Sequence, residues 1–162
     1  MVGLTRSQGP GSASEDPQMF VVTRKQWNAH PPGKKTRDLS LPVANIRFTH
    51  TGTSPCGTFD ECKKTLKKIQ FEHMDTLGHN DICHNFMIGG QGWVFEGRGW
   101  SHEPDMPSMY SEGNSQSLQI AYIGDFEDEA PPPELLKAAM EIVVYITRKR
   151  MIFHFFKGIH LN

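Results

Sequence analysis

The sequence predicts an α/β fold, a single domain in which a mixed central β-sheet is flanked by helices. The order of its periodic segments carries this prediction: a strand, a helix, a hairpin, a second strand and a second helix follow one another along 162 residues. A chain of this length buries roughly two thirds of its unfolded surface without needing metals or many cross-links. One hydrophobic core is therefore expected.

The N-terminal residues differ in composition from the rest of the chain. Residues 1–18 are rich in Gly, Ser, Pro and Gln and carry few bulky apolar side chains, so burial cannot offset the entropy lost on ordering them. We predict a disordered leader over residues 1–18 and an ordered domain over residues 19–162, with order beginning near Phe20. Residues 41–49 are predicted to form a strand with Val43 at its start, because proline is tolerated where a strand begins.

The first helix is expected to follow this strand. Thr58 and Glu61 have the spacing of a capping box, and apolar residues then recur at helical spacing on one face. The helix is expected to end at Gly78. Lysines on its other face suggest a nucleic-acid patch, but acidic residues interrupt them, so a solvated helix face is favoured.

The second half of the chain supplies a hairpin, a strand and a helix. Residues 85–88 and 93–95 flank a Gly-Gly-Gln-Gly link, which predicts a hairpin because glycine adopts the positive φ of tight turns. Residues 117–123 alternate in the manner of a strand. Three prolines at 131–133 lead into a helix expected over residues 134–150, which carries one apolar stripe.

Charge and hydropathy exclude two classes of partner. With 17 basic and 18 acidic residues the chain has no net field to hold a polyanion, so no nucleic acid is expected to bind. The longest apolar run falls far short of the ~20 residues that a bilayer-spanning helix requires. The N-terminus also lacks the basic and apolar regions of a signal peptide. No membrane span is predicted, and the compartment is left open.

The three cysteines permit two interpretations. Cys56 and Cys62 enclose five residues, a spacing that can close a disulfide across a turn entering a helix, with Cys83 left over. Alternatively, all three are reduced thiols of a cytosolic protein. The spacing by itself does not decide between these two possibilities.

The most specific pattern lies in the middle of the chain. Residues 81–92, Asp-Ile-Cys-His-Asn-Phe-Met-Ile-Gly-Gly-Gln-Gly, run into Glu-Gly-Arg-Gly-Trp at 96–100. With these segments, the chain from about Val22 to about Gly158 resembles the peptidoglycan recognition proteins. Further matching residues are Arg24, Trp27, Pro31, 41–43, His50, Thr51, Cys56, Cys62, Ile69, Gln70, His73, Met74 and 123–126. The resemblance implies a mixed β-sheet with surrounding helices, an L-shaped groove for the muropeptide stem and a Cys56–Cys62 disulfide.

Similarity to this family also implies a test for catalysis, since its active members are zinc amidases that cut between muramic acid and L-alanine. Such a site needs three protein ligands and a metal-bound water. The first ligand is the leading histidine of a His-His-Thr motif, whose place is taken here by Thr49, with His50 at the second histidine. Neighbouring strand residues point to opposite faces, so His50 is not expected to replace the missing ligand.

The other parts of the family's zinc site are altered as well. The second ligand matches Ile159, with His160 one position late, and the third ligand would follow Asn162. The tyrosine that helps to polarise the scissile carbonyl corresponds to His84. We therefore expect a C-terminally shortened, non-catalytic member of the family, with no metal, no cofactor and no catalytic residue.

A rewired zinc site is the alternative, and it would make the chain an N-acetylmuramoyl-L-alanine amidase. No two histidines have the i,i+4 spacing of a zinc-binding helix, and Cys83 and His84 are expected to be strand neighbours with opposed side chains. Both observations disfavour it. The side chains available to such a site are His50, His79, Cys83, His84, His102, His154 and His160.

The resemblance assigns ligand contacts more readily than catalysis. Relatives that select diaminopimelate-type peptidoglycan grip the extra carboxylate of its third stem residue with an arginine, matched here by Arg98. A Gly-Trp pair precedes that arginine and is matched by Gly78 and His79. The expected ligand-binding residues are Arg98, Gly78, His79, His84, Trp100 and His50.

Acidic residues beyond Trp100 bear on this assignment. Glu103 and Asp105 would repel the carboxylates of the stem if they faced the groove. The alternative for Arg98 is an exposed side chain paired with Glu96 or Glu103.

These matches predict a non-catalytic domain of innate immunity. Its expected partner is bacterial peptidoglycan or muropeptide of the diaminopimelate type, or another peptidoglycan recognition protein whose action it modulates. A purely protein-binding modulator with a closed groove is a further alternative.

Overall fold

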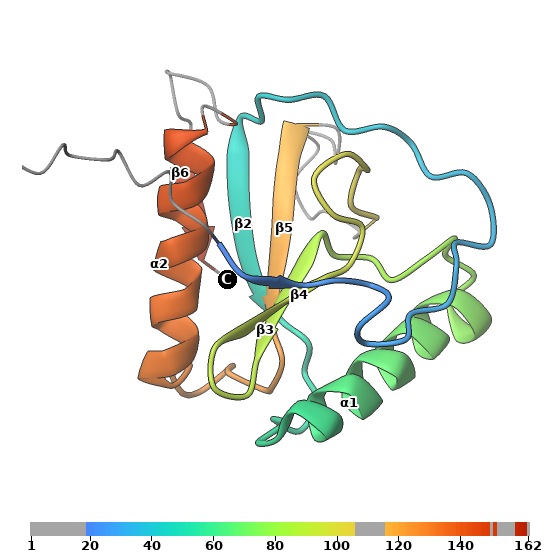
Figure 1. The fold of residues 1–162 in the computed structure, drawn as a ribbon, viewed down its shortest axis with the longest axis horizontal. Helices are drawn as coiled ribbons and strands as arrows, with labels where there is room; N and C mark the ends of the chain where they lie inside the picture. The colour runs from blue at the N-terminus through green and yellow to red at the C-terminus, as the bar shows by residue number, and fades with distance from the viewer. Residues whose placement is uncertain (1–18, 106–115, 150, 152–157, 162) are drawn as a thin grey trace, which may run out of the picture.

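The structure, a computed structural model, describes residues 19–105, 116–149, 151 and 158–161 (Figure 1). The predicted leader over residues 1–18 and His154 lie outside the described residues. The elements are β1 Val21–Val22, β2 Asn45–His50, α1 Phe59–Phe71, the π-helical turn η1 Glu72–Thr76, β3 Phe86–Gly89, β4 Trp93–Glu96, β5 Ser117–Tyr122, α2 Pro133–Arg148 and β6 Gly158–Leu161.

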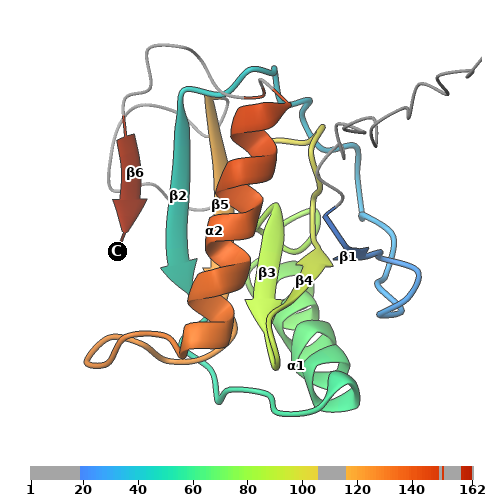
Figure 2. The same ribbon diagram turned by 60° about the vertical axis from the view of Figure 1, so that its left-hand side comes forward.

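The strands of the described residues form one six-stranded sheet in the order β1-β4-β3-β5-β2-β6. β3 and β4 pair antiparallel as the predicted hairpin, and the other neighbours pair parallel. The sheet is therefore mixed, which confirms the predicted α/β class. Figures 1 and 2 show α2 against one side of the sheet and α1 on the other.

The hairpin turn depends on glycine, as the sequence predicts. Gly90 has φ of 59° and Gly92 has φ of 96°, and residues other than glycine rarely adopt such positive φ values. A Cβ atom on Gly90 would also collide with the ring of Trp93. Larger residues would therefore be strained at positions 90 and 92.

Both predicted helices are present. In α1 the capping box is confirmed, since Thr58 Oγ1 accepts from Glu61 N at 3.2 Å and Glu61 Oε2 accepts from Thr58 N at 3.0 Å. After η1 the chain leaves the helix and passes Gly78, whose φ is 77°. α2 begins on a proline, a residue suited to the first helical turn. Within the described residues, no helix is long and apolar enough to cross a bilayer.

The strand predicted over residues 41–49 is shorter at its start than expected. β2 begins at Asn45, because the amide of Val43 donates to Met151 O at 2.8 Å instead of joining the ladder with β5. The peptide bond between Leu41 and Pro42 is cis. From Asn45 to His50 the strand pairs in register with β5, from Ser117 to Tyr122.

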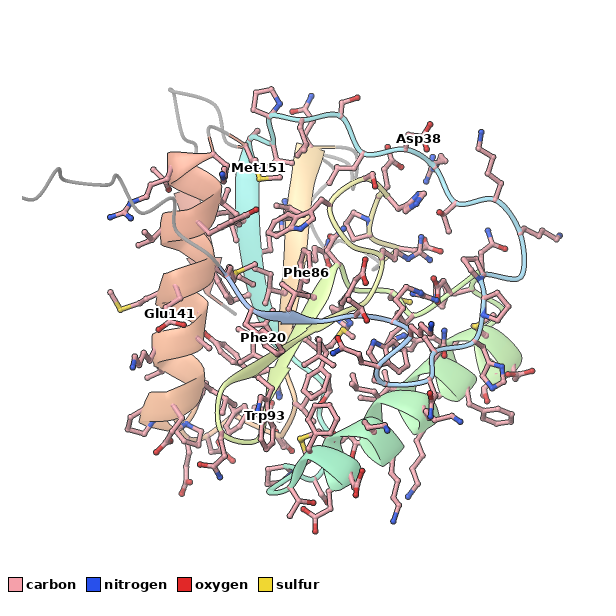
Figure 3. All side chains as sticks on the ribbon, viewed as in Figure 1. Phe20, Asp38, Phe86, Trp93, Glu141 and Met151 are labelled. Atoms are coloured by element: carbon pink, nitrogen blue, oxygen red, sulfur yellow. A yellow bond between two sulfur atoms is a disulfide. The ribbon has the colours of Figure 1, made fainter. Side chains whose placement is uncertain are left out.

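Two apolar clusters fill the two sides of the sheet. The cluster on the α2 side joins strand residues such as Phe48 and Phe86 to Ile142. The cluster on the α1 side joins Leu66 to Phe95 and further strand residues. Figure 3 shows Phe86 among the side chains at the middle of the sheet.

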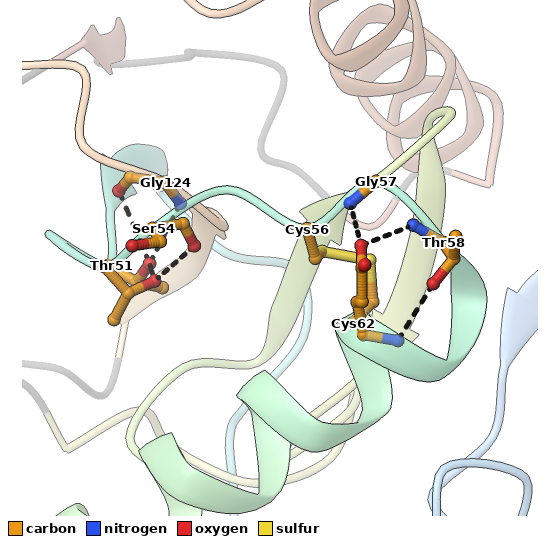
Figure 4. Close-up of a disulfide and its surroundings, with 9 residues drawn as sticks. Thr51, Ser54, Cys56, Gly57, Thr58, Cys62 and Gly124 are labelled. Carbon is orange, nitrogen blue, oxygen red and sulfur yellow. Dashed lines mark hydrogen bonds between the residues drawn. A yellow bond between two sulfur atoms is a disulfide. The ribbon is translucent and has the colours of Figure 1, made fainter.

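A disulfide fixes the start of α1. Cys56 and Cys62 are bonded, and both are buried in the cluster on the α1 side (Figure 4). This confirms the pairing that the family resemblance implied and rules out three reduced thiols. Cys83 is free and buried.

Candidate ligand-binding site

Most of the predicted site residues lie on two loops, the first of which joins the end of η1 to β3. Its anchor is Asp81, which is 2% exposed. Its carboxylate receives hydrogen bonds from the side chains of Arg24 and Gln70 and from the amide of Ile82, at 2.7–3.0 Å. Arg24 Nη1 also lies 2.9 Å from Asp81 Oδ2. Several of the matching motif residues therefore serve to position this loop.

The second loop follows β4 and is tied to the first by its backbone. Gly97 N and Gly99 N both donate to Asn85 O, and Arg98 N donates to His84 O at 2.9 Å. A Cβ on Gly97 would collide with His84 O, so only glycine allows the two loops to come this close. Glycine at this position sets where Arg98 lies.

Arg98 is buried between the loops, with 6% of its surface exposed. Its Nε donates to Ile82 O at 2.7 Å and its Nη1 to Glu103 O at 2.9 Å. Its Nη2 is buried without a hydrogen bond and lies 3.7 Å from Asp105 Oδ2. The alternative of an exposed arginine paired with Glu96 or with the carboxylate of Glu103 is therefore wrong. The carboxylate of Glu103 pairs with Arg37 at 3.0 Å.

His79 follows Gly78 at the end of the helical turn and reaches the same place. Its Nδ1 lies 2.9 Å from Asp105 Oδ2. Asp105 is held in turn by a hydrogen bond from its amide to Cys83 O at 3.0 Å. The structure thus places His79 and Arg98 beside one carboxylate that belongs to the chain itself.

A half-buried imidazole, His73, and a buried one, His84, lie next to this pair. The ring of His73 is 6.1 Å from that of His79 and 5.9 Å from that of His84. His73 Nδ1 accepts from the amide of Cys83 at 3.0 Å, whereas both ring nitrogens of His84 are buried without a hydrogen bond. Cys83 and His84 lie in the loop before β3, so the expectation that they are strand neighbours is wrong.

Burial sets the protonation of this cluster. Burial, with smaller contributions from the neighbouring His73 and Arg98, lowers the pKa of His84 from 6.5 to about 3. The pKa of His73 is lowered by burial and by the proximity of His79. Burial raises the pKa of the Cys83 thiol to about 12, so the thiol is not a nucleophile near neutral pH.

Two predicted site residues make their ring or hydrogen-bond contacts away from Asp105. The ring of Trp100 contacts that of Phe86 in a tilted arrangement with ring centres 4.3 Å apart and approaches Tyr145 of α2, so it packs against the core on the α2 side. His50 ends β2 next to the end of β5, where its Nδ1 accepts from the amide of Phe126 at 3.1 Å. Arg98, Gly78, His79 and His84 are brought together. His73 and Asp105 join them, although the predicted set contained neither.

A pocket borders the second loop on its outer side. It has a volume of about 320 Å³ and is lined by Arg98, Trp100 and His102, together with Arg24 and Asp81 from the anchor of the first loop. Arg98 therefore borders this hollow as well as lying near the carboxylate of Asp105.

The position expected for the first zinc ligand is visible in the sheet. Thr49 pairs with Ala121 of β5, which belongs to the cluster on the α1 side, whereas Phe48 packs on the α2 side. His50 is level with Tyr122, a member of the α2-side cluster. Among the described residues, no three His, Cys, Asp or Glu side chains form a group that suits a metal ion. The backbone of His160 pairs with that of Arg47.

Comparison with known proteins identifies the family. A model described as N-acetylmuramoyl-L-alanine amidase matches residues 39–157. Peptidoglycan-recognition protein 1 of Holotrichia diomphalia is 35% identical over 128 residues, which are 76% of this chain and 61% of that protein. The chain thus spans about three fifths of the length of this relative.

Solved structures agree with this result. Drosophila peptidoglycan recognition protein SD superposes with a TM-score of 0.80 at 30% identity, covering 88% of this chain and 83% of that one. Peptidoglycan recognition protein LE, solved in complex with tracheal cytotoxin, a monomeric diaminopimelic acid-type peptidoglycan, has a TM-score of 0.80 at 26% identity and covers 87% and 81%. The chain belongs to the peptidoglycan recognition protein family and has its amidase-like fold.

Proposed function

We propose that this chain is a non-catalytic recognition domain of innate immunity that binds diaminopimelate-type muropeptide through Arg98, His79 and the loop around them. The observation that carries the proposal is the state of Arg98. Two of its donor nitrogens are fixed by backbone carbonyls, and the third, Nη2, is buried without a hydrogen bond. A fixed guanidinium with a remaining donor is suited to a carboxylate. Peptidoglycan recognition protein LE binds a ligand that carries such a carboxylate.

Isothermal titration with a monomeric diaminopimelate-type muropeptide tests this proposal. His79→Ala removes one carboxylate contact from a side chain that is 22% exposed, and it should weaken binding roughly tenfold. Lys64→Ala, on the exposed face of α1, is the matched control and should bind like the wild type. Arg98→Lys keeps the charge but loses the planar fork, so binding should weaken again while circular dichroism reports an intact fold. A wild-type protein that gives no binding signal would overturn the proposal.

The non-catalytic half of the proposal rests on Thr49. A threonine hydroxyl is a poor ligand for zinc, and strand alternation turns the neighbouring His50 away from that position. We expect the purified protein to contain no stoichiometric zinc and to release no stem peptide from peptidoglycan. Elemental analysis and chromatography of the digest measure these two quantities. Stoichiometric zinc together with released peptide would establish the rewired amidase instead.

A second candidate function is association with another peptidoglycan recognition protein. It is favoured by an apolar hollow of about 720 Å³ between α2 and the β1–β4 edge of the sheet, lined by Phe20, Trp93 and Met140 among others. Figure 3 labels two of these residues, Phe20 and Trp93. Phe20 is 74% exposed and Met140 is 70% exposed. Sedimentation velocity of mixed family members should show a heterodimer that Met140→Asp abolishes. A mixture that sediments as separate monomers would exclude this function.

A further inference from the structure

Asp105 already stands where a bound carboxylate would be expected. Its Oδ2 lies 2.9 Å from His79 Nδ1 and 3.7 Å from Arg98 Nη2. The first distance is that of a charge-assisted hydrogen bond, and the second is too long for one. The chain therefore supplies its own carboxylate to these two groups, but leaves the donor of Arg98 only partly satisfied.

The remaining charges near Arg98 do not compete for this role. The carboxylate of Asp81 is engaged by Arg24 and Gln70, and that of Glu103 by Arg37. Among the described residues, the carboxylate that forms an ion pair with Arg98 is that of Asp105. A ligand carboxylate that bonds to both His79 Nδ1 and Arg98 Nη2 must displace Asp105 or share the space with a like charge, and both weaken its binding.

The side chain of Asp105 is less enclosed than the guanidinium of Arg98 that it faces. Its backbone is fixed by the bond from its amide to Cys83 O, but its side chain is 40% exposed. Arg98 is held by two carbonyls and is buried. A rotation of the Asp105 side chain would free His79 and the Nη2 of Arg98 while the guanidinium stays in place.

We propose that Asp105 is a specificity-determining residue, an internal carboxylate that occupies the binding place of the third stem residue's extra carboxylate and lowers the affinity for diaminopimelate-type muropeptide. This inference rests on the proposed function, because it requires that Arg98 and His79 contact the ligand. Without the charge of Asp105, Arg98 and His79 would bind a ligand carboxylate more tightly than they do in the wild-type protein.

The test compares the wild type with Asp105→Asn by isothermal titration against three muropeptides: the diaminopimelate type, the same ligand with its extra carboxylate amidated, and the lysine type. Asparagine keeps the size and the hydrogen-bond acceptor of the aspartate but removes its charge. We expect Asp105→Asn to bind the diaminopimelate type roughly tenfold more tightly and to leave the Kd of the other two nearly unchanged. Asp128→Asn, an exposed acid in another loop, is the control for general charge and should not alter any Kd.

Each other result has its own meaning. If the wild type binds the diaminopimelate type and Asp105→Asn binds it equally or more weakly, Asp105 supports the site and the inference is overturned while the proposed function stands. An equal gain for all three ligands also overturns it, because the effect would not depend on the extra carboxylate. If neither protein binds any muropeptide although circular dichroism shows both folded, the proposed function fails, and the inference fails with it. Asp105→Ala repeats the comparison in case the asparagine forms a new contact.

Discussion

At the residue scale, His84 shows what it costs to bury an imidazole. It is 3% exposed, and neither ring nitrogen has a hydrogen bond. A buried polar group without a partner loses its hydration and gains nothing in exchange. The ring therefore remains neutral and contributes to the site by its shape rather than by charge.

Replacing this ring with an apolar one should make the protein more stable. His84→Phe keeps a flat aromatic side chain and removes two unsatisfied nitrogens, so the free energy of unfolding should rise by about 1 kcal/mol. Urea denaturation measures the change. His50→Phe is the matched control, since it loses the bond to the amide of Phe126 and should be less stable than the wild type. A destabilised His84→Phe protein would show that the imidazole has a partner in solution.

The same residue should make stability depend on pH. Between about pH 3 and pH 6.5 the unfolded chain protonates this histidine while the folded protein does not, so the unfolded state binds more protons. Stability is therefore complete above pH 6.5 and falls as the pH is lowered, by up to about 1.4 kcal/mol per pH unit for each such group. His73 adds a contribution of the same sign. Denaturation at pH 7 and pH 4.5 should show a smaller difference for His84→Phe, and an unchanged difference would contradict the assignment.

At the element scale, the site depends on two loops whose backbones nearly touch. Gly97 permits the contact because it has no Cβ, and the amides of residues 97–99 then bond to the carbonyls of His84 and Asn85. The amphipathic pattern of the neighbouring strands does not encode this contact. Gly97 must be small because the loop before β3, which is distant in sequence, packs against it in the fold.

Gly97→Ala should therefore be costly. The new methyl group must push the two loops apart, which should lower the free energy of unfolding by about 2 kcal/mol or more and shift the position of Arg98. Gly52→Ala provides the comparison, because Gly52 has φ of 67° but nothing within 4 Å of an added Cβ. Its cost should be about 1 kcal/mol, from backbone strain alone. Chemical denaturation of both variants measures the difference, and equal losses would disprove the steric argument.

At the scale of the whole molecule, Asp81 joins segments that are far apart in sequence. Its carboxylate bonds to Arg24 near β1 and to Gln70 of α1, and Arg24 also donates to the carbonyls of His30 and Gly97. The network connects the N-terminal edge of the domain to the helix and to both site loops. Its three side chains, those of Arg24, Gln70 and Asp81, are among the residues that carry the family resemblance.

Breaking this network should affect global stability. Asp81→Asn leaves the guanidinium of Arg24 partly buried without its counter-charge, and the free energy of unfolding should fall by about 3 kcal/mol. Asp38→Asn, whose side chain is 78% exposed, should leave it nearly unchanged. Thermal and urea unfolding measure both. A small effect at Asp81 would mean that solvent compensates for the lost charge.

The sequence by itself determined the order of the elements from β2 to α2, the hairpin glycines, the capping box of α1 and the family, but it did not predict the edge strands β1 and β6. These features are encoded by neighbours a few residues apart, through periodicity, turn conformation and capping. The start of β2 was placed too early because the partner of Val43 is Met151, more than one hundred residues away.

Only the tertiary structure showed which of the predicted site residues lie together. Arg98, Gly78, His79 and His84 lie close together, whereas Trp100 packs on the α2 side and His50 lies at the end of β2. The tertiary structure also buried Arg98 and set Asp105 against it. Such relations depend on which loops meet across the sheet, and no local pattern of residues specifies that meeting.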